Sequence, residues 1–199
     1  MQAEDPLIFR LTLLVMFILF IAHRAYYNAK ISADEKEVLD QKDEGWVERL
    51  AGFLVFIALI SSVLYIAKPS WMIWSSVPFP DYVRWFGAAL AGLGFLLLQY
   101  SHFALGQHWS DRPQIASDHE LIQNGPYKRI RHPIYTSFLM ILSAPLFLAA
   151  NWFLGWAWIA GTAIDITKRI QYEEQRLEGL FGDEYRRYRE RTGALLPRL

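Results

Sequence analysis

Long stretches without a charged side chain are the feature that most restricts how this chain can fold. Residues 11–22, 50–67, 85–105 and 132–164 contain no Asp, Glu, Lys or Arg. A helix needs about 20 mostly apolar residues to cross the roughly 30 Å hydrocarbon core of a bilayer. Stretches of this length and composition predict an all-α protein that is integral to a membrane.

These stretches predict about five membrane-spanning helices. The first three are Leu7–Tyr27, Leu50–Ala67 extended by Trp46 and Val47, and Trp85–Leu105. Because Leu7–Tyr27 lacks a small-residue cleavage site and precedes a polar segment, we interpret it as a retained span and not as a secretory signal.

The fourth stretch, Pro133–Ile164, would measure roughly 48 Å as a single helix. That is too long for one upright crossing and slightly short for two. The segment "AANWFLGW" at 149–156 offers a turn, and Pro145 lies just before it. We therefore expect a tight helical hairpin that reaches about Arg169, with one long tilted helix as the alternative.

The distribution of basic residues predicts the topology. Five spans place residues 24–49, 106–132 and the tail from Lys168 on one side of the membrane, together with 17 of the 20 Lys and Arg residues. Basic residues concentrate in cytoplasmic segments. The C-terminus is therefore expected in the cytoplasm and the N-terminus outside.

The overall composition argues against several classes of protein. The formal net charge is +0, whereas a nucleic-acid binder normally shows a clustered basic excess. The absence of cysteine excludes disulfides, zinc fingers and thiol nucleophiles. The five histidines lack the spacing of a helical metal-binding pair, so we expect no metal.

Two local patterns predict how helices pack. Ala88 and Gly92 form a small-xxx-small pair in the third span, and Gly94 adds another place for close backbone approach. In the tail, apolar residues recur at three- and four-residue steps and predict an amphipathic helix. Gly182 should weaken this helix, and Gly193 with Pro197 should end it. The apolar residues of this pattern are Leu177, Leu180, Phe181, Tyr185 and Tyr188.

A ladder of charges and a histidine–proline pair are the candidate chemical features. Asp165, Arg169 and Glu173 follow one another at i, i+4 steps from the last apolar stretch into the tail. The ladder either positions the helix through ion pairs or serves a functional site, because an intramembrane Asp usually faces a partner or a wet cavity. His132 precedes Pro133 at the expected start of the hairpin, where a helix dipole presents its positive end.

Three motifs together resemble the isoprenylcysteine carboxyl methyltransferase family, whose core is shared with phospholipid N-methyltransferases. They are "LGQHWSD", "HELIQNGPYKRIRHPIYTS" and "RIQYEEQRLEGLFGDEYRRYRERTGALLP". The resemblance extends from about Trp85 to Leu199. We therefore expect one membrane domain over 1–199, in which 1–84 holds the first two spans and 85–199 forms the methyltransferase core.

The resemblance implies S-adenosylmethionine as the cofactor, bound in a pocket that faces the cytosol. The pocket would be built from the 106–132 segment, the hairpin and the amphipathic tail helix. The cofactor contacts carried over by motif are His119, Glu120, Leu121, Ile122, Tyr127, His132, Pro133, Ile134 and Tyr135. The catalytic residues on the acceptor side would be Arg169 and Glu173.

The implied reaction is methyl transfer to a carboxylate of a lipophilic acceptor, of the isoprenylcysteine O-methylation type. A phospholipid or amine N-methyltransferase and a non-catalytic membrane scaffold are the alternatives. The expected partners are the acceptor and membrane lipids, without nucleic acid or metal. Five spans resemble short prokaryotic members of the family, which favours the inner cell membrane, with the endoplasmic reticulum as the alternative.

Overall fold

The computed structural model describes residues 6–29, 45–105 and 121–198. Within these ranges every named element is a helix. The elements are α1 (Leu7–Asn28), α3 (Trp46–Ala67), η1 (Pro69–Ser75), α4 (Asp81–Leu105), η3 (Gly125–Lys128), α5 (Pro133–Leu148), α6 (Trp152–Phe181) and α7 (Asp183–Arg191). The all-α prediction is confirmed.

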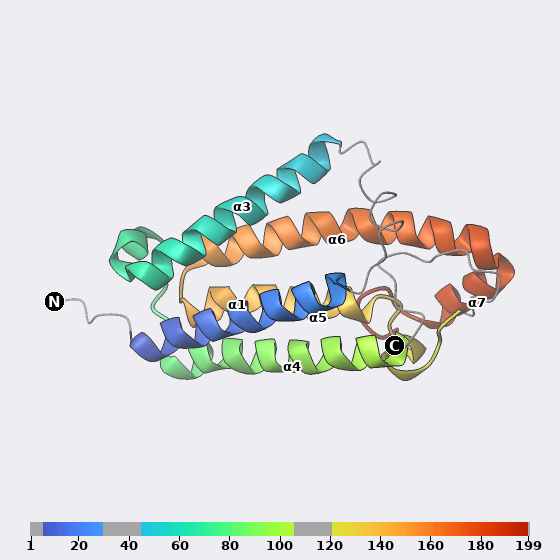
Figure 1. The fold of residues 1–199 in the computed structure, drawn as a ribbon, viewed down its shortest axis with the longest axis horizontal. Helices are drawn as coiled ribbons and strands as arrows, with labels where there is room; N and C mark the ends of the chain where they lie inside the picture. Colours follow the sequence, from blue (N-terminus) through green and yellow to red (C-terminus); the bar gives the residue numbers. More distant parts are fainter. Residues whose placement is uncertain (1–5, 30–44, 106–120, 199) are drawn as a thin grey trace.

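The long helices run side by side along the length of the molecule (Figure 1). α4 packs on α5, α5 on α6 and α6 on α3, while α1 contacts α3, α4 and α5. One end of this bundle, the turn end, holds η1, the α5–α6 turn and the starts of α1 and α4. The opposite end, the charged end, holds residues 121–136, the last turns of α6, α7 and the C-terminal tail.

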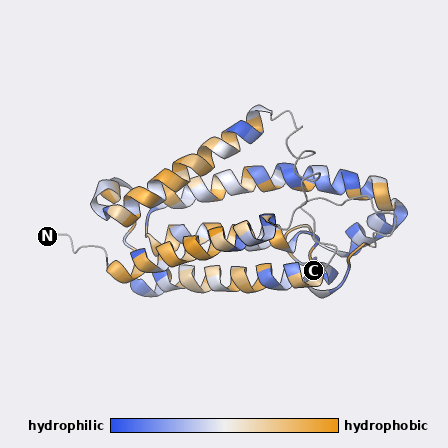
Figure 2. Ribbon diagram, viewed as in Figure 1, coloured by the Kyte–Doolittle hydropathy of each residue, from blue (hydrophilic) through white to orange (hydrophobic). Residues whose placement is uncertain are grey.

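Hydropathy supports integration in a membrane. α1, α3 and α4 are each long and apolar enough to cross a bilayer, and α5 is a shorter apolar helix. Figure 2 shows that hydrophobic residues dominate α1 and α3, whereas the far part of α6 and α7 are mainly hydrophilic. The exact count of five spans and the sidedness stay predictions.

The predicted helical hairpin is confirmed. α5 ends at Leu148 and α6 begins at Trp152, so the turn lies inside the predicted 149–156 segment. Asn151 caps α6 by accepting a 3.0 Å hydrogen bond from the amide of Leu154. Its amide group also donates to the Met72 carbonyl at 3.1 Å and to Ser75 Oγ at 2.8 Å. The turn is therefore fixed against η1.

α4 approaches α5 closely at Gly94, which was predicted, and at Gly87, which was not. A Cβ added to Gly94 would lie 2.8 Å from Ile141 Cγ1, and one added to Gly87 would lie 2.6 Å from Phe147 Cβ. A Cβ on Gly92 would meet nothing within 4 Å. The expectation for Gly94 is confirmed, but the Gly92 part of the small-xxx-small pair is wrong. Gly87, Ala91 and Gly94 share the buried face because their spacing follows the helical repeat.

Two arginines close helix ends at the turn end. Arg10 Nε donates to the Ile66 carbonyl at 3.0 Å, at the end of α3. Arg84 is buried, and its Nε and Nη2 donate to the Leu148 carbonyl at 3.0 and 2.6 Å, at the end of α5. Both cations thus meet the negative end of a helix dipole.

The predicted tail helix is two helices. α6 continues past Arg169 to Phe181, and Gly182, at φ +50°, turns the chain into α7. A positive φ suits glycine because it has no Cβ. Tyr185 and Tyr188 are buried as the apolar pattern predicted. The break between the two helices thus lies at Gly182, which was expected only to weaken a single helix. α7 ends at Arg191, just before Gly193.

Candidate active site at the charged end

The start of α5 is the base of a polar network at the charged end. His132 is the N-cap residue of α5 and Pro133 occupies its first turn, as the histidine–proline pattern predicted. Proline stabilises a first helical turn because its missing N–H has no partner to lose there. His132 and Pro133 are buried, and Tyr135 is half-buried one turn further on.

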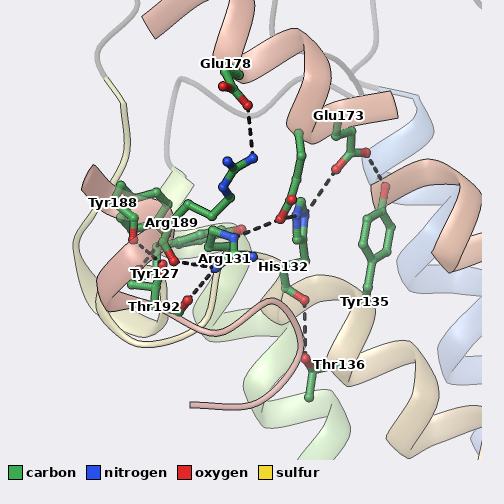
Figure 3. A network of polar contacts seen from close by, with 11 residues as sticks. Tyr127, Arg131, His132, Tyr135, Thr136, Glu173, Glu178, Tyr188, Arg189 and Thr192 are labelled. Atoms are coloured by element: carbon green, nitrogen blue, oxygen red, sulfur yellow. Dashed lines mark hydrogen bonds and ion pairs between the residues drawn. The ribbon is translucent and has the colours of Figure 1, made fainter. Parts of the chain in front are cut away.

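Adjacent glutamates on α6 meet this helix start (Figure 3). Glu173 Oε2 lies 3.3 Å from His132 Nδ1, and Glu173 Oε1 accepts a hydrogen bond from the Tyr135 hydroxyl. Glu174 Oε1 lies 3.4 Å from His132 Nε2 and accepts from Arg131 Nε at 2.9 Å. His132 is therefore held between two carboxylates that α6 supplies from successive positions.

The two carboxylates favour the protonated form of His132. Burial by itself lowers the pKa of His132, but hydrogen bonds and charges from Glu173 and Glu174 outweigh it, so the net pKa is raised. The hydrogen bond from His132, helped by Arg131 and opposed by burial, lowers the pKa of Glu174 to about 2. Both ring nitrogens of His132 can then donate, which suits an imidazolium between two anions.

The C-terminal tail lies against the same helix start. The amides of Arg131 and His132 donate to the carbonyls of Gly193 and Ala194 at 2.9 and 3.0 Å. Thr136 Oγ1 donates to the Leu195 carbonyl at 2.7 Å. The tail thus borders the site on the side opposite α6.

Buried tyrosines connect η3 to α7. The hydroxyl of Tyr188 donates to the Tyr127 carbonyl at 2.7 Å. Burial raises the pKa of Tyr188 to about 12, so its hydroxyl stays a donor at neutral pH. Tyr127 itself is buried, while Leu121 and Ile122, which precede η3, are half-buried.

The sequence-predicted residues divide into three groups. Tyr127, His132, Pro133, Ile134, Tyr135 and Glu173 gather at the charged end, with Leu121 and Ile122 on the segment that leads to it. His119 and Glu120 lie outside the described residues. Arg169 lies one helical turn before Glu173, and its Nε forms a 2.8 Å ion pair with Asp165.

The Asp165–Arg169 step of the charge ladder is present, with the two side chains 44% and 51% exposed. Glu173, the third residue of the ladder, contacts His132 and Tyr135 at the start of α5. The ladder therefore connects the α6 surface to the start of the hairpin. Whether Arg169 and Glu173 are catalytic stays a prediction.

Sequence reasoning missed Arg131 and Glu174. Arg131 lies in the basic segment 106–132 and Glu174 lies in the third motif, but neither was predicted as a site residue. The signal that could have identified them is the pairing of two adjacent cationic groups, Arg131 and His132, with two adjacent anionic ones.

Among the residues that the structure describes, no group of three or more His, Asp or Glu side chains is arranged to hold a metal ion.

By its fold, this chain is a helical membrane protein. The start of α5 and the last turns of α6 bring carboxylates, an imidazole, a guanidinium and a phenol together in one network. Residues 88–179 match the family model of the isoprenylcysteine carboxyl methyltransferase (ICMT) family. This match confirms, over residues 88–179, the resemblance inferred from the motifs.

Relatives carry two kinds of name. Methanethiol S-methyltransferase 1 of Bradyrhizobium diazoefficiens is 42% identical over 71 residues, which cover 36% of this chain and 24% of that protein. The probable protein-S-isoprenylcysteine O-methyltransferase of Oryza sativa subsp. indica is 28% identical over 125 residues, covering 58% and 62%.

A solved structure supports the fold. The eukaryotic intramembrane Ras methyltransferase ICMT matches with a TM-score of 0.57 and 19% identity, over 79% of this chain and 54% of that one. The chain therefore spans less than two thirds of the length of each of these three proteins.

Proposed function

We propose that the chain is an S-adenosylmethionine-dependent methyltransferase that works in a membrane and methylates a carboxylate of a lipophilic acceptor. One observation carries the proposal. Glu173, which the family resemblance assigns to the acceptor side, is in contact with His132 and Tyr135, which it assigns to the cofactor. Methyl transfer requires cofactor and acceptor to meet in one place and in line.

The residues at the charged end fit S-adenosylmethionine, which carries a carboxylate, an ammonium group and a sulfonium. The first turn of α5 has no side-chain cap, so its amides and dipole suit an anion. The Glu173 carboxylate suits a cationic centre. Leu121, Ile122 and Ile134 provide half-buried apolar surface. When bound, the cofactor supplies an electrophilic methyl group on sulfur.

A carboxylate acceptor needs no general base, because it is already an anion at neutral pH. The chain must instead hold it and exclude water, since desolvation favours a step in which an anion and a cation lose their charges. Arg169 can hold a carboxylate with two parallel N–H groups. Asp165 orients this arginine through its Nε.

A thiol acceptor is the second candidate, because the methanethiol S-methyltransferase relative shares 42% identity over its matched segment. A thiol or an amine must lose a proton in the reaction, so either would need an acceptor group. Glu173 is a candidate for this role because it lies beside the predicted cofactor residues His132 and Tyr135. A carboxylate acceptor needs no such group, so it remains the first candidate.

The test combines calorimetry with labelled methyl transfer. Purified protein is titrated with S-adenosylmethionine, then given methyl-labelled cofactor with an S-prenylated cysteine, methanethiol or phosphatidylethanolamine vesicles. We expect binding and an ester product from the prenylated cysteine. Failure of the wild-type protein to bind the cofactor would favour the scaffold alternative, and a labelled thioether or amine would replace the carboxylate acceptor.

Arg169 variants sharpen this test. Arg169→Lys keeps the charge but loses the two-point geometry, so cofactor binding should stay near normal while transfer falls, by roughly 10²-fold. Arg169→Ala should lose more, and Asp165→Asn less. If Arg169→Ala retains most of its turnover, the arginine serves only the ion pair with Asp165, and an amine acceptor becomes the better proposal.

The sidedness of the site is also proposed, from the distribution of basic residues. The charged end should face the cytoplasm. A C-terminal reporter that is active only after export should stay silent, and a strong signal would contradict the five-span topology.

A further inference from the structure

Arg131 and Glu174 have a place in the network that the methyl-transfer proposal does not use. Their ion pair measures 2.9 Å, and the side chains are only 10% and 19% exposed. A pair this sheltered is expensive to desolvate unless further hydrogen bonds satisfy both partners. The contacts of each partner therefore indicate what the pair holds in place.

The further contacts of Arg131 lie in α7 and the tail. Its Nη1 donates to the carbonyls of Arg189, at 3.2 Å, and of Thr192. These carbonyls belong to the last turn of α7 and the residue after it, where a helix leaves acceptors unsatisfied. Arg131 thus fastens the end of α7 to the start of α5.

The further contact of Glu174 is His132. One carboxylate oxygen, Oε1, serves both Arg131 Nε and His132 Nε2. His132 Nδ1 in turn faces Glu173. Glu174 therefore acts on Glu173 and the α5 start through His132.

We propose that Glu174 and Arg131 are a pair of positioning residues that join the docking of the C-terminal tail to the assembly of the cofactor rim. The part of this inference that concerns the cofactor rests on the proposed function, whereas the part that concerns docking of the tail does not. When the pair is intact, the tail, the α5 start and the α6 extension are held together. When it is broken, the tail loosens and His132 loses one of its two carboxylates.

The charged and titratable groups that surround His132 come from every element packed against it. α6 contributes Glu173 and Glu174, α5 contributes Tyr135, and the preceding residue is Arg131. Tyr127 of η3 and Tyr185 of α7 interact electrostatically with Glu173 and Glu174 respectively. Among the described residues, Glu173 and Glu174 are the carboxylates that face His132, so removing the charge of Glu174 should make His132 easier to deprotonate.

Glu174→Gln is the central variant, because it keeps the size and removes the charge. Glu178→Gln is the matched control: Glu178 lies on the same helix one turn further and pairs with the exposed Arg186 at 2.8 Å and with Arg189 at 3.0 Å. Three quantities are measured. They are hydrogen exchange of the 186–198 peptide at one pH without cofactor, affinity for S-adenosylmethionine by calorimetry, and the pH midpoint of that affinity.

For Glu174→Gln we expect tail exchange at least about 10-fold faster and cofactor affinity at least about 10-fold weaker, the scale of one hydrogen bond to a charged group. The pH above which affinity falls should move to a lower value, which a purely structural role would not produce. Glu178→Gln should stay within about twofold of the wild-type protein, as expected of an exposed pair.

Several outcomes would overturn the inference. One is a Glu174→Gln protein whose tail exchange is within twofold of wild type. Another is a loss of cofactor affinity with full tail protection, since Glu174 would then touch the cofactor directly. If the wild-type protein binds no cofactor, the proposed function fails while tail exchange still decides the positioning role.

Should Glu174→Gln fail to fold, Arg131→Lys provides the same test. Lysine has its donors on a single nitrogen and cannot reproduce the separate Nε and Nη1 contacts of Arg131 with Glu174 and the Thr192 carbonyl. It should loosen the tail, and wild-type exchange in this variant would refute the pair.

Discussion

The two ends of the bundle satisfy their cations in different ways. At the turn end, Arg84 donates to the Leu148 carbonyl and lies 3.8 Å from the centre of the Phe9 ring. At the charged end, Arg131 binds the carboxylate of Glu174 in addition to backbone carbonyls, and His132 faces the carboxylate of Glu173. Backbone carbonyls cannot titrate or leave, whereas ionised side chains can change their charge and exchange partners with a ligand. We infer that the contacts at the turn end stabilise the fold, whereas those at the charged end form the functional site.

The largest expected effect follows the loss of Arg84 at the turn end. Arg84→Ala removes two hydrogen bonds to Leu148, one to the Tyr65 hydroxyl and the contact with Phe9. The free energy of unfolding in detergent should fall by about 3 kcal/mol, since a buried carbonyl loses a charged donor. Affinity of the folded fraction for S-adenosylmethionine should not change.

Lys68→Ala is the control, because Lys68 is an exposed cation at the same end that lies over the Trp71 ring. It should alter unfolding by less than about 0.5 kcal/mol. Equal effects from the two substitutions would show that Arg84 does not hold the turn end.

A somewhat smaller effect is expected in the α4–α5 contact, which connects the two ends. Gly94→Ala would place a Cβ 2.8 Å from Ile141 Cγ1 and 3.1 Å from the Ser137 carbonyl, so neighbouring atoms must move. The free energy of unfolding should fall by about 2 kcal/mol. Gly92→Ala meets open space and should be neutral or slightly stabilising. Equal stabilities for the two variants would refute this packing.

The smallest effect is a pH dependence restricted to the charged end. Because the pKa of His132 is raised in the folded protein, its proton stabilises the site below the ordinary value of 6.5. That contribution is lost as the pH rises through the raised pKa. Glu174 acts in the opposite direction: its contribution is full above the ordinary value of 4.5 and is lost as the pH falls from there through its lowered pKa of about 2.

Spin labels can measure this difference, since the chain has no cysteine of its own. Labels on Lys128→Cys and Gln171→Cys report on the charged end, and labels on Ser70→Cys and Tyr82→Cys on the turn end. All four positions are exposed. Raising the pH should broaden the distance distribution of the first pair only. Broadening of both pairs would indicate general unfolding.

The sequence predicted the fold well because charge-free stretches, proline positions and the hairpin turn are local signals. Pro133 begins α5 as the histidine–proline pair predicted, and the α5–α6 turn falls within the predicted segment 149–156. The facing surface of α4 was less predictable, because both candidate faces of that helix carry small residues. Only packing against Ile141 and Phe147 selects Gly87 and Gly94.

For the site, motif resemblance identified residues that converge, but not how they bond. The i, i+4 spacing relates Glu173 to Arg169 on the same helix, and it gives no information about contacts with α5. The contacts of Glu173 and Glu174 with His132 join positions about 40 residues apart, and only the hairpin brings them together. The same distance in sequence concealed the role of Arg131.

The most direct test of the account is the affinity of the protein for S-adenosylmethionine, measured by calorimetry on wild type and on His132→Ala, Tyr135→Ala and Lys68→Ala. The first two substitutions alter the charged end, and the third alters an exposed cation at the turn end. We predict that wild type and Lys68→Ala bind equally, while His132→Ala and Tyr135→Ala purify normally and bind at least about 10-fold more weakly. Wild-type affinity in both charged-end variants would contradict the placement of the cofactor there.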